Sequence, residues 1–243
     1  MFALLAATWK RLLLLGLLAQ LPFAVIFGVA FAAVHAGLVS PLALTPVSVV
    51  LGEFLAAWIW AASLIVLQAR ASGEQMAVWA TVRAALRDWR QVLKLWALFV
   101  MLSSPYLAYT VYFAMTLDIS AAPLLGHPVA ELVFHYLSFA FILLPLAVLV
   151  ERRGLARAFR LSHFSVRTAA VLIVWLVAGI AVDRALDFAE AVVPSAGATV
   201  ALSFLIDIAM GVIGSVVIYA IFLRIRTAEK AREIATPAQA AVL

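Results

Sequence analysis

Six long apolar segments constrain the fold of this chain more than any other feature of its sequence. They lie at about residues 12–36, 44–69, 92–116, 129–150, 168–193 and 199–223. Each is long enough to supply the roughly 20 mostly apolar residues that a membrane-spanning helix needs. Leu, Val, Ala and Phe run through all six without the alternation that is typical of β-barrel strands. The sequence therefore predicts an all-α, polytopic membrane protein with six transmembrane helices.

Composition excludes a large soluble domain. Hydrophobic residues make up 67% of the 243 positions and charged residues 12%, whereas soluble domains are about half apolar and a quarter charged. We therefore predict a single transmembrane domain over residues 1–226 and a short cytoplasmic tail over residues 227–243. The first apolar run, of about 24 residues, exceeds the roughly 7–15 of a signal-peptide core, which favours a retained helix. Cysteine is absent, which excludes thiolate metal sites and cysteine nucleophiles.

Basic residues fall on one side of this layout. Sixteen of the 17 Lys and Arg side chains precede the first segment, follow the last, or lie in the connectors after the second and fourth segments. Because cytoplasmic loops carry an excess of Lys and Arg, this side is predicted to be cytoplasmic, together with both termini. The chain then forms three helical hairpins, in repeat units of about 2–70, 75–151 and 153–226, with short interfacial helices on the cytoplasmic side.

The two connectors share an arginine spacing of i, i+4 and i+7. The first holds Arg83, Arg87 and Arg90, and the second holds Arg153, Arg157 and Arg160. On a helix each trio shares one face. We interpret each trio as the cationic face of an interfacial helix that contacts anionic lipid headgroups or a partner protein. The alternative interpretation is that these arginines only set the topology.

Apolar residues of the first connector are predicted to insert into the membrane interface. They are Trp79, Val82, Leu86 and Trp89, on a face next to the arginines. Thr81 and Asp88 are expected to point away from that face.

The segment that contains the second connector resembles a known family. Its sequence LLPLAVLVERRGLARAFRLSHFSVRTAAVLIVWL is similar to the YciC-like inner-membrane proteins and to the membrane domain that precedes the catalytic barrel of some bacterial glycerophosphodiester phosphodiesterases. The matching positions are Pro145, Glu151, Gly154, Ala158, Phe159, Arg160 and Ser162. Leu161 and His163 depart from the pattern, at positions where a second basic residue and an aromatic residue are common. The resemblance implies a six-helix bacterial inner-membrane protein, and without the barrel no phosphodiesterase chemistry carries over.

Ionisable residues within the predicted spans are candidate functional groups, because inserting one costs at least about 2.5–3.5 kcal/mol. They are Glu53, Glu131, His135, Asp183, Arg184, Asp187 and Asp207, all expected near the midplane or in the outer half of the bilayer. If they converge on one cavity, they form a path for protons or cations, as chains of acidic residues and His do in transporters. Otherwise they are neutralised or hydrogen-bonded between helices.

A metal site is a third interpretation of these polar residues. His127, Glu131 and His135 are spaced by four positions, and with Asp183 or Asp187 they offer nitrogen and carboxylate ligands that suit zinc. Pro128 is expected to begin the helix, which leaves His127 at its edge, and no HExxH signature supports the site. No bound metal is therefore expected.

Small residues and prolines predict how the spans pack. Ala24, Gly28, Ala32 and Ala36 recur every four residues along the first span, and Gly211 and Ser215 do so on the last. Small residues at this spacing let helices approach closely. Pro22, Pro105 and Pro145 are expected to interrupt the first, third and fourth spans.

No motif for catalysis or cofactor binding occurs. A Walker loop, a dinucleotide fingerprint and a nucleophile elbow are all absent from the sequence, so we expect neither an enzyme nor a cofactor. The formal net charge of +5 points to anionic lipid rather than nucleic acid, because no nucleic-acid-binding module is recognisable. We expect a scaffold or accessory subunit that contacts lipid or a membrane protein complex through its basic face. The alternative is a small proton- or cation-coupled transporter that uses the intramembrane acids.

Overall fold

The structure is a computed structural model that describes residues 2–116, 128–192 and 196–240. In this part of the chain, α-helices are joined by turns and short loops. The helices are α1 (Phe2–His35), α2 (Pro41–Ala71), α3 (Val78–Arg87), α4 (Trp89–Thr116), α5 (Pro128–Phe141), α6 (Leu144–Leu149), α7 (Leu155–Ser162), α8 (Val166–Val192) and α9 (Ala196–Ala240). The predicted all-α fold class is confirmed for these residues.

Five helical segments are long and apolar enough to cross a membrane. They are Phe2–His35, Pro46–Ala71, Leu132–Leu149, Val166–Leu186 and Leu205–Glu233. Helix α4, which contains the third predicted span, is not among them, so the count of six spans stays a prediction. Length and composition alone support a multi-pass membrane protein here.

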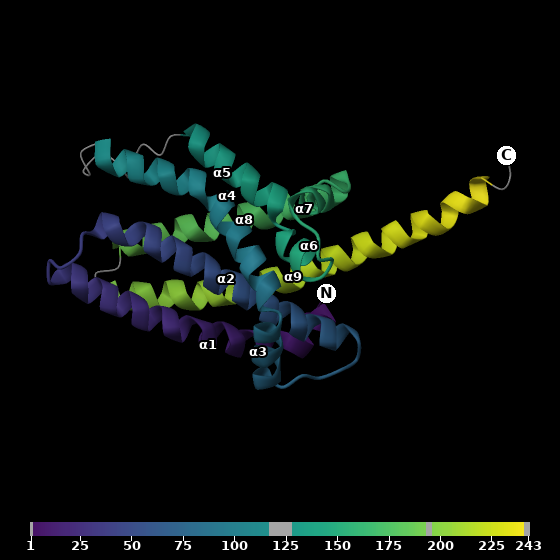
Figure 1. Cartoon of the computed structure of the whole chain (residues 1–243), viewed down its shortest axis with the longest axis horizontal. Helices are drawn as coiled ribbons and strands as arrows, with labels where there is room; N and C mark the ends of the chain where they lie inside the picture. Colours follow the sequence, from purple (N-terminus) through teal and green to yellow (C-terminus); the bar gives the residue numbers. More distant parts are fainter. Residues whose placement is uncertain (1, 117–127, 193–195, 241–243) are drawn as a thin grey trace.

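The long helices run lengthwise beside one another (Figure 1). Helix α1 packs against α2 and α9, and α2 packs against α4. The turn between α1 and α2 lies at one end of the bundle, whereas the N-terminus, α3, α6 and α7 lie toward the other end, which we call the connector end (Figure 1). The C-terminal part of α9 extends beyond the bundle at the connector end. The residues predicted as a short tail thus continue the last helix as far as Ala240.

Pro145 interrupts its predicted span, as expected. Helix α5 ends at Phe141 and α6 begins at Leu144, because proline lacks an N–H and clashes with the preceding turn. Pro22 and Pro105, in contrast, lie inside the unbroken helices α1 and α4.

A tightly packed core lies at the connector end. Leu143, Leu144 and Leu146 are fully buried there, and burying one leucine side chain contributes about 1.5–3 kcal/mol. The short helices α3 and α7 pack onto this core through Val82 and Leu161, among others. Each of these helices therefore has one apolar side covered by protein, while Trp79 and Leu86 of α3 and Phe159 of α7 stay exposed.

Helix α3 of the first connector buries Thr81, Val82 and Ala85. Thr81, expected to point away from the apolar face, is fully buried beside Val82, and its hydroxyl donates to the Ala77 carbonyl at 3.1 Å. Trp79 and Leu86 are exposed. Val82, which was predicted to insert into the membrane interface, is instead buried in the protein core.

The glycines that bring helices close are not those that the small-residue spacing singled out. A Cβ at Gly28 or Gly211 would meet nothing within 4 Å. At Gly16 a Cβ would lie 3.0 Å from Ile208 of α9, and at Gly214 it would lie 2.9 Å from the Trp175 ring of α8. The close approach of α9 to α1 and α8 thus depends on which of its faces meets each neighbour. The spacing of small residues alone does not specify that face.

Candidate functional site

A cavity of about 790 Å³ opens at the connector end, between the α6–α7 turn, α7 and α9. Its charged lining residues are Arg153, Arg157, Arg160, Arg226, Arg232, Glu151, Glu229 and Glu233, and its apolar ones are Val150, Phe164 and Phe222. Five arginines thus face three glutamates, which leaves a formal surplus of two positive charges. We call this cavity the arginine pocket.

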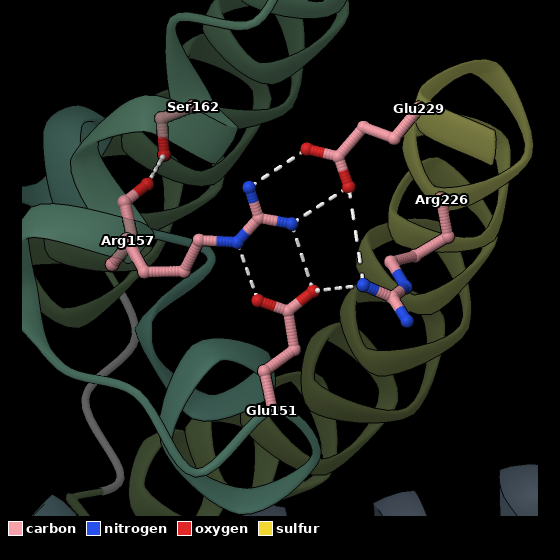
Figure 2. A network of polar contacts seen from close by, with 6 residues as sticks. Glu151, Arg157, Ser162, Arg226 and Glu229 are labelled. Atoms are coloured by element: carbon pink, nitrogen blue, oxygen red, sulfur yellow. Dashed lines mark hydrogen bonds and ion pairs between the residues drawn. The ribbon is translucent and has the colours of Figure 1, made fainter. Parts of the chain in front are cut away.

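Arg157 forms the centre of an ion-pair network in the pocket (Figure 2). Its Nε and Nη2 donate to the two carboxylate oxygens of Glu151. Its Nη1 and Nη2 donate to the two oxygens of Glu229, both at 2.7 Å. Arg226 adds a bond of 3.2 Å to Glu151. Two parallel forks of this kind match the planar guanidinium and are among the stronger ion pairs in proteins.

The network joins the α6–α7 turn and the adjacent helix α7 to α9, which is distant in the sequence. Glu151 lies in the turn after α6, Arg157 on α7, and Glu229 on α9 beyond its apolar part. Hydrogen bonds to Glu151, and next to Glu229, raise the pKa of Arg157 above its ordinary value. The same hydrogen bond lowers the pKa of the Glu229 carboxyl. Arg157 and Glu229 therefore both stay charged at neutral pH, and Arg157 has a positioning role.

Two arginines of the pocket remain available to a ligand. The side chains of Arg153 and Arg160 make no hydrogen bond or ion pair with a described residue, and both residues are exposed. Arg232 lies over the Phe164 ring, with Cζ 4.9 Å from the ring centroid. The guanidinium groups of Arg153 and Arg160 can offer planar N–H donors to the oxygens of a phosphate or carboxylate.

An adjoining groove begins at Phe164, which lines both cavities. The groove has a volume of about 250 Å³ and runs between α8 and α9 past Val171, Ile221 and Ile225, with Arg167 and Arg224 also in its lining. A charged pocket thus shares a wall with a largely apolar groove between two helices of the bundle.

The first connector has a different arrangement. Arg83 and Arg87 lie exposed on α3, which ends at Arg87. Arg90 lies on α4, 5.8 Å from the centroid of the Trp89 ring, so the trio does not share one continuous helix. In the second connector Arg153 likewise precedes α7. The break in each connector comes from a cap residue, Asp88 or Gly154.

The connectors are fastened to each other by polar contacts. Arg152 donates to Asp88 at 2.7 Å, and Lys94 donates to the Arg153 carbonyl at 2.9 Å. Arg11 reaches the Met76 carbonyl at 2.9 Å. Several basic residues that indicate topology therefore also hold the connector end together.

The intramembrane polar residues do not gather in one described cavity. Glu53 accepts a hydrogen bond from Ser103 and lines a separate cavity between α2, α4 and α5. His135, Arg184 and Asp207 do not line that cavity. The side chains of Glu131, Asp183 and Asp187, and residue His127, lie outside the described residues. Within the described part of the chain, no cluster of three or more potential metal ligands occurs.

Glu229 was not predicted as a functional residue, and Arg226 and Arg232 were predicted only as part of the cytoplasmic positive charge. A signal was present: Arg226, Glu229, Lys230 and Glu233 alternate in charge at three- and four-residue spacings, which is typical of an exposed helix. Glu151 had been noted only through the family resemblance.

No protein-family model, curated protein or solved structure matches this chain.

Proposed function

We propose that this protein is a non-enzymatic membrane scaffold or accessory subunit that binds anionic phospholipid in the arginine pocket. One observation carries the proposal: the side chains of Arg153 and Arg160 form no hydrogen bond or ion pair with a described residue, although the same pocket holds three carboxylates. Glu151 and Glu229 are already taken up by Arg157. The surplus positive charge of the pocket is therefore complementary to an anion from outside the chain, and a phosphate group suits it.

The adjoining groove favours a lipid over a soluble phosphate compound. Phe164 separates the charged pocket from a groove lined by Val171 and Ile221. A phospholipid would place its phosphate at the arginines and an acyl chain along this groove, so one molecule would satisfy both surfaces. A free anion would leave the apolar groove uncovered.

The membrane orientation forms part of the proposal. We place the connector end at the cytoplasmic surface, with six spans and both termini inside, because sixteen of 17 Lys and Arg residues fall on that side of the predicted layout. The anionic cytoplasmic leaflet attracts each basic residue near its surface by about 1 kcal/mol. The resemblance of the second connector to YciC-like proteins supports a bacterial inner membrane.

The α3 arginines have a less specific role in this proposal. Arg83 and Arg87 are exposed and line none of the cavities described above. They would strengthen attraction to an anionic surface without selecting a headgroup. The transporter alternative lacks a connected path among the described residues, since the cavity of Glu53 is not lined by Asp207 or His135.

Retention of lipid by the purified protein tests the proposal. The double variant Arg153→Ala/Arg160→Ala should bind phosphatidylglycerol at least about tenfold more weakly, because even one lost charged hydrogen bond costs about 1.5–3 kcal/mol. The control Arg83→Ala/Arg87→Ala removes the same charge from the other connector and should retain nearly the wild-type amount. Native mass spectrometry measures the lipid bound to each double variant after delipidated protein is incubated with phosphatidylglycerol or with phosphatidylcholine. Equal losses in the two double variants would reject a specific site in the arginine pocket.

A further inference from the structure

A second cavity, of about 260 Å³, lies inside the bundle between α2, α4, α5 and α6. Its polar lining residues include Glu53 and Ser103, and its aromatic ones are Trp60, Phe99, Phe134 and Phe141. It shares no lining residue with the arginine pocket. It is therefore a separate site, whose chemistry the lipid proposal does not use.

Helical periodicity brings these side chains together. Glu53 and Trp60 are seven positions apart on α2, and Phe134 and Phe141 are seven positions apart on α5, so each pair lies on one helix face. The indole of Trp96 on α4 donates to the Val50 carbonyl on α2 at 3.0 Å. This bond fixes α4 against α2 one turn before Glu53.

The Glu53 carboxylate has an incomplete set of partners. Ser103 Oγ donates to Oε1, whereas Oε2 has no hydrogen-bond partner among the described residues. None of the described residues that line the cavity is Lys, Arg or His. A carboxylate in largely apolar surroundings is costly unless a cation or proton compensates it. The cavity is thus complementary to a positively charged ligand.

The aromatic lining favours an organic cation over a metal ion. Calcium and magnesium need about six or more oxygen ligands, whereas this cavity offers one carboxylate and the hydroxyls of Ser103 and Ser138. The faces of Trp and Phe rings attract quaternary ammonium groups. We propose that this cavity binds a small organic ammonium cation, with Glu53 as counter-ion and Trp60 and the phenylalanines as ring contacts.

Choline and its neutral isostere 3,3-dimethyl-1-butanol test the proposal. They have the same shape and differ in the charge of one central atom. Calorimetric titration into the full chain in uncharged detergent should show choline binding, and binding of the neutral alcohol at least about tenfold weaker. No binding of choline, or equal binding of the two compounds, would overturn the proposal.

Two variants assign the site within the protein. Glu53→Gln should weaken choline binding by at least about tenfold, while the control Asp207→Asn, which removes an acid outside this cavity, should leave it unchanged. Trp60→Leu keeps the carboxylate but removes a ring and should also weaken binding, so it serves if Glu53→Gln does not fold. Equal weakening by Glu53→Gln and Asp207→Asn would place the effect outside this cavity and refute it. Loss of lipid binding in the arginine-pocket variants bears only on the other proposal.

Discussion

Arg157 and Glu229 lie 72 positions apart in the sequence, yet two hydrogen bonds of 2.7 Å join the guanidinium of one to the carboxylate of the other. The pair fixes α7 against α9 just beyond the apolar part of α9. It also positions Arg232, three residues further along the same helix, at the arginine pocket. The geometry of the proposed lipid site therefore depends on a pair whose charged groups are already bonded to each other.

Replacing Arg157 by lysine should destabilise the protein although the charge is kept. A compact ammonium group cannot form two parallel forks with Glu151 and Glu229 at once. The free energy of unfolding should fall by about 2 kcal/mol. Circular dichroism in detergent should show this as a lower midpoint of thermal unfolding. Arg160→Lys is the control, since Arg160 makes no hydrogen bond or ion pair with a described side chain. A shared midpoint for the two variants would contradict the structural role of Arg157.

Acid should remove the contribution of Glu229 to the stability of the folded protein. Its pKa is lowered in the folded protein, chiefly by the hydrogen bond from Arg157, so the unfolded chain binds the proton more readily. The stabilisation is therefore fully present above the ordinary Glu pKa of about 4.3 and is lost as the pH falls through the lower value of the folded state. The difference in unfolding midpoint between the wild type and Glu229→Gln should be large at pH 7 and shrink toward pH 3. A difference that stays constant over this range would exclude ionised Glu229 as its source.

The sequence predicted the helical class and the two connectors because both depend on local pattern. Apolar runs of about 20 residues mark spanning helices, and short helices do occur in both connectors, although neither arginine trio lies on one continuous helix. The partners of those arginines could not be predicted, because Glu229 reaches Arg157 only through the packing of α9. Glu53 was recognised as unusual from its place in an apolar run, whereas its aromatic surroundings come from three different helices. Long-range packing of this kind leaves no periodic signal.

The backbone at Arg152 should be relieved by glycine. Arg152 has a φ of 56°, in the left-handed region that costs a residue with a Cβ about 1–2 kcal/mol. Its side chain pairs with Asp88, but both side chains are substantially exposed, and such pairs contribute little. Arg152→Gly should therefore unfold at a higher temperature than Arg152→Ala, because both lose the ion pair and only glycine relieves the backbone. A higher unfolding temperature for Arg152→Ala than for Arg152→Gly would show that the backbone at residue 152 is not strained in solution.

Two glycines of α9 form a matched pair for testing the packing of α8. A Cβ at Gly214 would lie 2.9 Å from the Trp175 ring, whereas at Gly211 it would meet nothing within 4 Å. Alanine is favoured over glycine within a helix by about 1 kcal/mol, so Gly211→Ala should be neutral or stabilising. Gly214→Ala should lower the unfolding midpoint, because forcing a bulky ring to move costs about 1–3 kcal/mol. Trp175→Leu should reduce the penalty at Gly214 by removing the ring that causes it, and an unchanged penalty in this background would refute the close contact between α8 and α9.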